Sequence, residues 1–174
     1  MSRVVWITGL PASGKTSLAR ALVALLRERG VDATLVDSDE TRSVITPQPT
    51  YEAAERMLVY RAMAYLAKRL DESGTVPVVA ATAHARELRN EVRQIAGGLF
   101  LVHASAPLAI CEARDPKGLY ERARAQEDGA MPGIHVRYEP PDDADLEVDT
   151  GGDDPDGAAR RVLDALDHRG TFTR

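Results

Sequence analysis

The chain has 174 residues, of which 44% are apolar and 28% charged, and its formal net charge is −5. We expect one domain over residues 1–174 and no membrane-spanning segment, because this length suits a single core and no apolar run approaches the ~20 residues that a span needs. The acidic balance disfavours nonspecific nucleic-acid binding, and a single cysteine, Cys111, cannot form an internal disulfide, which favours a cytoplasmic protein.

The first seventeen residues predict a strand, a phosphate-binding loop and a helix in direct succession. Residues 4–8 are apolar up to a threonine, and residues 9–16 fit the spacing Gly, four residues, Gly-Lys-Thr. Apolar residues then recur at helical spacing from Leu18 to Leu26, and Gly30 stands where that helix would stop. This context on both sides makes a chance glycine-rich turn a poor alternative.

Each fixed position of this loop has a physical role toward a nucleoside triphosphate. Gly9 and Gly14 lack a β-carbon, so successive N–H groups can point at a β-phosphate beside the positive end of the following helix. Lys15 supplies a charge for the β- and γ-phosphate oxygens, and the Thr16 hydroxyl offers Mg²⁺ a ligand. The motif predicts binding of a nucleoside triphosphate with Mg²⁺, but it does not by itself establish a kinase.

A short strand over residues 33–36 is followed by acidic residues, Asp37 and Asp39, and by Arg42. Ligands of open α/β sheets bind at the carboxyl ends of the strands, so these side chains should face the same crevice as the phosphate loop. An alternative is that Asp39 or Ser38 only caps a helix entering at Glu40.

A long helix is predicted from about residue 51 to residue 73. Its expected apolar face comprises Ala54, Met57, Leu58, Ala62, Tyr65, Leu66 and Leu70. Arg56 and Arg61 lie near its early turns, where arginines are by default solvated. A buried strand over 76–81 follows, and His84 just beyond it is expected to be structural rather than a base.

The remaining elements alternate in type along the chain. We expect helices at 87–95, 107–113 and 156–166, and strands at 99–103 and 146–150. With the loop after the first strand, this alternation predicts a three-layer α/β P-loop nucleoside-triphosphate-binding fold, a parallel sheet flanked by helices. The charged, glycine-punctuated stretch from about 114 to 139 predicts a mobile lid over the triphosphate, with an ordinary solvated loop as the alternative.

Several stretches together resemble the adenylylsulfate kinase (APS kinase) family over nearly the whole chain. The most specific is residues 107–120, which follow the family's Pro-Leu-x-x-Cys-Glu-x-Arg-Asp-Pro-Lys-Gly-Leu-Tyr almost letter for letter. The phosphate loop, the Asp-x-Asp with Arg42, Gly133-Ile134 and residues 138–141 follow in the family's order. The resemblance implies transfer of the γ-phosphoryl group of ATP to the 3′-hydroxyl of adenosine 5′-phosphosulfate (APS), and it suggests a homodimer.

The resemblance also assigns residues to roles, by their place in the family's motifs. ATP would contact Gly9, Ala12, Ser13, Gly14, Lys15, Thr16, Ser17, Arg114 and Lys117, and Mg²⁺ would bind Thr16 directly and Asp37 through water. The acceptor nucleotide would contact Asp39, Arg42, Tyr51, Arg56, Arg86, Met131 and Ile134. Lys15, Asp37 and Asp39 are the predicted catalytic residues, and Asp39 would orient the acceptor hydroxyl and accept its proton.

The departures from the family's pattern lie on the acceptor side. Met131 stands where the family has an aromatic residue that stacks on adenine, and Pro132 replaces a threonine. Val59 and Ala83 replace an asparagine and a serine. Three hypotheses therefore stay open: APS as the acceptor, another nucleotide or metabolite hydroxyl as the acceptor, or a nucleotide-binding regulatory protein with little transfer activity.

Overall fold

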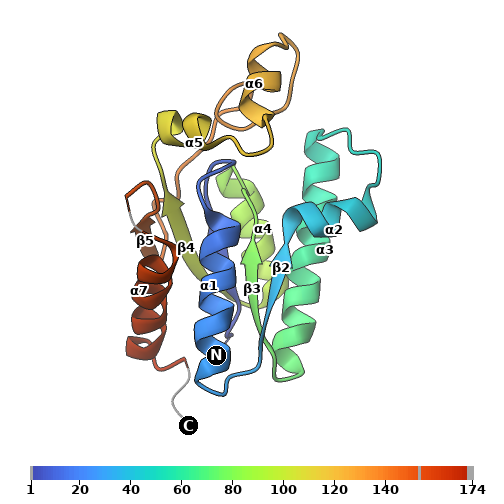
Figure 1. Ribbon diagram of the computed structural model, residues 1–174. Helices are drawn as coiled ribbons and strands as arrows, with labels where there is room; N and C mark the ends of the chain where they lie inside the picture. Colours follow the sequence, from blue (N-terminus) through green and yellow to red (C-terminus); the bar gives the residue numbers. More distant parts are fainter. Residues whose placement is uncertain (1, 153, 172–174) are drawn as a thin grey trace.

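The computed structural model describes residues 2–152 and 154–171, and within these residues five strands form one sheet (Figure 1). The strands are β1 Val5–Thr8, β2 Ala33–Asp37, β3 Val76–Ala80, β4 Phe100–Ser105 and β5 Leu146–Asp149. They lie in the order β2-β3-β1-β4-β5, and each neighbouring pair is parallel. The predicted parallel sheet of a P-loop fold is confirmed.

Helices cover both faces of this sheet and also stand above one edge. They are α1 Lys15–Glu28, α2 Ser38–Ile45, α3 Ala53–Glu72, α4 Arg86–Ala96, α5 Leu108–Arg114, α6 Leu119–Arg124 and α7 Pro155–His168. α1 packs against α7, and α3 packs against α4. The two pairs lie on opposite sides of the sheet, which gives the three predicted layers.

The central strand β1 shows why the sheet needs both layers. Its side chains alternate between faces, so that Val5 and Ile7 enter the core beneath α1 and α7. Trp6 and the preceding Val4 enter the second core, beneath α3 and α4. All four residues are fully buried, as expected for a parallel strand covered on both faces.

The predicted apolar face of α3 is partly wrong. Of the predicted face, four residues lie exposed, Ala54, Leu58, Tyr65 and Leu66. The buried residues of this helix are Arg56, Val59, Tyr60, Met63, Ala64 and Ala67. Met57 and Leu70 do pack against the core. Both stripes have helical spacing, and the buried one includes an arginine, which a search for apolar residues passes over.

The topology gathers the motifs at the carboxyl edge of the sheet. Residues 9–14 join β1 to α1 at this edge, α2 follows β2 there, and α5 and α6 stand above it (Figure 1). The expected lid, about residues 114–139, contains α6. Across the described ranges, no helix is both long enough and apolar enough to cross a membrane.

Candidate active site

The phosphate loop leads into α1 without a side-chain cap on the helix. Gly14 is the N-cap residue in a left-handed conformation with φ of 94°, and no side chain caps the helix. The Ser13 hydroxyl is buried and has no hydrogen-bond partner among the described residues. Gly9 is packed so closely that a β-carbon there would lie 2.6 Å from the Ala104 carbonyl oxygen. These features suit a bound phosphate group at the helix end.

Lys15, the first residue of α1, lies buried directly after this loop. Its Nζ donates a hydrogen bond to the Leu10 carbonyl oxygen at 2.6 Å. Burial lowers the pKa of Lys15 to about 8, although the nearby carboxylates of Asp39 and Asp37 act in the opposite direction. A desolvated ammonium of this kind gains strongly from an anionic partner, and triphosphate oxygens are such a partner.

Thr16 and Asp37 connect the phosphate loop to the end of β2. The Thr16 hydroxyl donates to Asp37 Oδ2 at 2.7 Å. The other oxygen of Asp37 accepts the Asp39 N–H at 2.8 Å, which makes Asp37 the N-cap of α2. The capping alternative for Ser38 or Asp39 is wrong, because α2 begins at Ser38 and the capping carboxylate is that of Asp37. Asp39 thereby keeps its own carboxylate free for another partner.

That partner comes from the lid. Lys117 Nζ forms an ion pair with Asp39 Oδ2, and this hydrogen bond raises the pKa of Lys117. Arg114 donates to the Thr150 carbonyl oxygen at 2.7 Å, and one of its guanidinium nitrogens lies near Gly14. The structure therefore brings both predicted lid cations to the phosphate loop and its neighbour α2.

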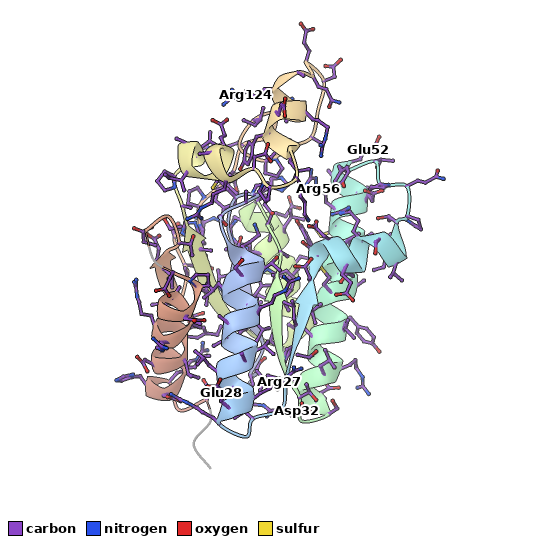
Figure 2. All side chains as sticks on the ribbon, in the orientation of Figure 1. Arg27, Glu28, Asp32, Glu52, Arg56 and Arg124 are labelled. Atoms are coloured by element: carbon purple, nitrogen blue, oxygen red, sulfur yellow. The ribbon has the colours of Figure 1, made fainter. Side chains whose placement is uncertain are left out.

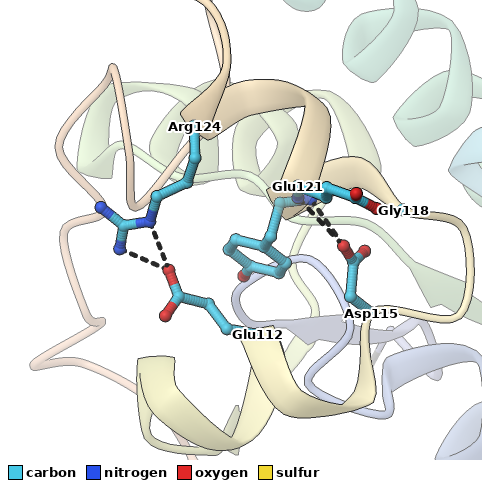
Figure 3. A pocket seen from close by; sticks show the side chains of 6 residues that line it. Glu112, Asp115, Gly118, Glu121 and Arg124 are labelled. Atoms are coloured by element: carbon cyan, nitrogen blue, oxygen red, sulfur yellow. Dashed lines mark hydrogen bonds and ion pairs between the residues drawn. The ribbon is translucent and has the colours of Figure 1, made fainter.

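The base of the lid is itself ordered by side chains, as Figure 3 shows. The Asp115 carboxylate accepts the Leu119 N–H at 2.7 Å and the Tyr120 N–H at 3.0 Å, and so caps α6. Arg124 on α6 pairs with Glu112 on α5. These contacts tie α5 to α6, which favours a structured element over a plain solvated loop.

A second cluster forms around the Tyr51 ring. The Arg42 guanidinium carbon lies 4.9 Å from the ring centroid, and that of Arg56 lies 5.7 Å from it. Arg56 is buried, which lowers its pKa, and its Nε donates to the Tyr51 carbonyl oxygen at 2.8 Å. It also donates to the Ala130 carbonyl oxygen, and Figure 2 shows Arg56 where the first turns of α3 face the lid. Met131, the next residue along the chain, is thus beside this cluster.

The remaining predicted site residues are Ala12, Ser17, Ile134 and Arg86. Ala12 in the loop has φ of 59°, and Ser17 is exposed on the first turn of α1. Ile134 lies in a turn, and its N–H donates to the Met131 carbonyl oxygen at 3.2 Å. Arg86 is not brought into the Tyr51 cluster. Its exposed guanidinium pairs with Asp142, and it lines a pocket with Arg89 and Arg137. Arg61 pairs on the surface with Glu91.

His84, which was expected to be structural, lies partly buried just beyond β3. Its Nδ1 has no hydrogen-bond partner among the described residues. Burial, reinforced by the charge of Arg56, lowers its pKa. The backbone supports the structural interpretation, because the His84 carbonyl oxygen accepts the Glu139 N–H at 2.8 Å.

Comparison with known proteins decides which family this site belongs to. The model of the adenylylsulphate kinase family matches residues 1–149. The chain belongs to the adenylylsulphate kinase family. An adenylyl-sulfate kinase of Gloeothece citriformis is 36% identical over 95% of this chain and 94% of that protein. One from Shewanella amazonensis is 37% identical over 94% of this chain and 83% of its own.

A solved member of the APS kinase family has the same fold. The Mycobacterium tuberculosis APS kinase, in complex with AMPPNP and APS, superposes with a TM-score of 0.89 at 34% identity, covering 94% of this chain and 96% of that one. The resemblance inferred from the motifs of residues 9–16 and 107–120 is therefore confirmed.

In the present chain, reasoning from the sequence missed two residues that make contacts at the site. The Tyr120 hydroxyl donates to the Pro11 carbonyl oxygen at 2.8 Å and so ties the lid to the phosphate loop. Glu55 forms an ion pair with Arg42, the arginine whose guanidinium lies over the Tyr51 ring. The sequence did mark Tyr120, because this residue ends the most specific family motif. Nothing in the sequence marked Glu55, since a glutamate in the first turn of a helix is common.

Proposed function

We propose that this chain is an ATP-dependent kinase that transfers the γ-phosphoryl group of ATP to the 3′-hydroxyl of APS. The observation that carries this proposal is the meeting of two clusters at one sheet edge. The phosphate loop with Asp37 and the Tyr51 cluster of arginines both lie there, and the same lid contacts each of them. Family membership supports both the donor and the acceptor.

On the donor side, the chain holds the triphosphate by charge and backbone N–H groups. Lys15 and the backbone N–H groups at the start of α1 bind the β- and γ-phosphates, and Arg114 approaches from the lid. The Thr16 hydroxyl and the Asp37 carboxylate, already in contact, would hold Mg²⁺, directly and through water respectively. When bound, the ion neutralises phosphate charge.

On the acceptor side, Asp39 orients the hydroxyl and accepts its proton, a role that requires hydrogen-bond reach. In the ligand-free structure its carboxylate is held by Lys117. A bound γ-phosphate gives Lys117 a second anionic partner and thereby frees Asp39 for the hydroxyl. Arg42 and Arg56 bind the anionic group of the acceptor, and the Tyr51 ring supplies a stacking surface.

An alternative acceptor is the second candidate, and the interior of the acceptor side motivates it. Val59, where the family has an asparagine, is fully buried and offers a ligand no polar group. Met131 and Ala83 likewise replace groups that would contact APS. A purely regulatory nucleotide-binding protein is the weakest hypothesis, because binding alone would not need Asp37 and Asp39 together with the loop.

The experiment that tests the proposal measures ADP release from MgATP with APS as the acceptor, beside a panel of other nucleotides and sugar nucleotides. We expect fast, saturable turnover with APS. Turnover with another acceptor and none with APS would replace the acceptor and keep the donor site. No turnover across the panel would favour the regulatory protein.

Two properties outside the site are also proposals. The family resemblance supports a homodimer, which sedimentation velocity would test. Residence in the cytoplasm is supported by the buried thiol of Cys111, which is a free cysteine.

A further inference from the structure

Glu55, in the first turn of α3, accepts three hydrogen bonds with its carboxylate. Oε1 accepts the Thr50 N–H at 2.9 Å, and Oε2 accepts the Tyr51 N–H at 2.8 Å. Oε2 also accepts from Arg42 Nη1 at 3.1 Å. The Glu55 and Arg42 side chains are only 13% and 8% exposed, so this ion pair is largely shielded from water. One carboxylate thus connects the loop before α3 to an arginine on α2.

The residue that this carboxylate holds is in a strained conformation. Tyr51 has φ of 59°, in the left-handed region that non-glycine residues rarely adopt. Such a conformation persists only where its surroundings enforce it. Glu55 binds the N–H of Tyr51, and Arg56 binds its carbonyl oxygen at 2.8 Å, so both ends of the residue are fixed. Tyr51 stays 43% exposed and offers surface to a ligand.

The same carboxylate fixes a charge next to that ring. Arg42 lies over the Tyr51 ring while its Nη1 is held by Glu55. The N–H groups of Thr50 and Tyr51, together with the Arg42 guanidinium, lower the pKa of Glu55, so its carboxylate stays ionised at neutral pH. Glu55 therefore sets the position of an aromatic ring and of a cation at once.

We propose that Glu55 is a positioning residue for the acceptor, holding the Tyr51 ring and the Arg42 guanidinium in the arrangement that receives the base and the anionic group of the acceptor nucleotide. The proposal rests on the proposed function. Glu55 touches neither ATP nor the reacting hydroxyl; it acts through its two neighbours. Replacing Glu55 should therefore raise the KM for the acceptor and leave the KM for ATP unchanged.

The test compares Glu55→Gln with the wild-type protein. Glutamine keeps the size of the side chain but loses its charge, and one of its two terminal positions becomes a donor facing N–H groups. We expect the KM for APS to rise about 10–100-fold, the effect typical of lost hydrogen bonds to a charged group, with the KM for ATP unchanged within about twofold. Glu55→Asp keeps the charge with a shorter reach and should fall between the two.

A second measurement follows the loop directly, without turnover. Hydrogen exchange of the Thr50 and Tyr51 amides should be faster in Glu55→Gln, because these amides lose their acceptor. Glu72→Gln is the matched control, since Glu72 lies at the other end of α3 and pairs with Arg69 on the surface. It should change neither the KM for APS nor the exchange of these amides.

The outcomes separate this proposal from the one on which it rests. Wild-type protein without APS turnover would refute the proposed function. Wild-type turnover with an unchanged KM for APS in Glu55→Gln would refute the role of Glu55 alone. A parallel loss of kcat and melting temperature, with both KM values kept, would show that Glu55 only stabilises the fold.

Discussion

The donor half of the site, residues 9–17 with Asp37, and the acceptor half, Arg42, Tyr51 and Arg56 with residues 130–131, are built in different ways. The donor half lies where a central strand turns directly into a helix, and its groups come mainly from the backbone. The acceptor half is assembled from two helices and two loops. Glu55 pairs with the Arg42 side chain, and Arg56 donates to the backbone carbonyl oxygens of Tyr51 and Ala130. A local motif can specify the first, whereas the second depends on contacts between distant segments.

The largest expected effect tests the residue between the two halves. Asp39→Asn should lower kcat by about 10²–10⁴-fold, because an amide cannot accept the proton of the acceptor hydroxyl, while the KM for ATP stays near its wild-type value. Steady-state kinetics with both substrates would measure this. Glu40→Gln, the neighbouring carboxylate on the same turn of α2, is the control and should be close to wild type. Unchanged turnover in Asp39→Asn would remove Asp39 from the mechanism.

A stability measurement tests the helix on which the acceptor half stands. Met63→Ala should cost about 2–5 kcal/mol of the free energy of unfolding, because Met63 is fully buried on α3. Leu58→Ala on the same helix should change this free energy by less than about 0.5 kcal/mol, because Leu58 is 56% exposed. Urea unfolding would compare them. A larger loss in Leu58→Ala than in Met63→Ala would mean that the apolar stripe expected from the sequence is the buried face after all.

A backbone change tests the donor half. In Gly9→Ala the new methyl group would lie 2.6 Å from the Ala104 carbonyl oxygen, so the loop must shift. We expect ATP affinity to fall about 10–100-fold, in line with a cost of roughly 1–3 kcal/mol for overpacking. Calorimetry with a nonhydrolysable ATP analogue would measure it. Gly30→Ala, where a β-carbon meets nothing within 4 Å, should lose some stability to its positive φ but keep ATP affinity.

The smallest effect concerns the pH dependence of kcat/KM for ATP. With a pKa of about 8, Lys15 is charged in the free enzyme below pH 8 and loses its proton as the pH rises through that value. The triphosphate favours the charged form, so kcat/KM for ATP should be flat below pH 8 and fall about tenfold per pH unit above it. A profile for ATP that stays flat to pH 9.5 would contradict this, provided that the protein remains folded across the range.

The sequence predicted the donor half well because its chemistry is local. The order of strands and helices and the phosphate loop follow from spacing within a few residues, and Thr16 and Asp37 do meet as their motifs imply. The acceptor half depends on contacts between distant segments. Arg86 was expected beside the acceptor, and in the structure its guanidinium pairs with Asp142, 56 residues further along. No local pattern could show this pairing, or that of Glu55 with the backbone of Tyr51.

The parallel sheet also determines which end of the molecule can be attached to something else. β1 begins and α7 ends at the edge of the sheet opposite the lid, far from the clustered loops (Figure 1). An affinity tag, a fluorescent label or a solid support joined to either terminus should therefore leave the entrance to the site open. Immobilised protein should process nucleotides as the free protein does.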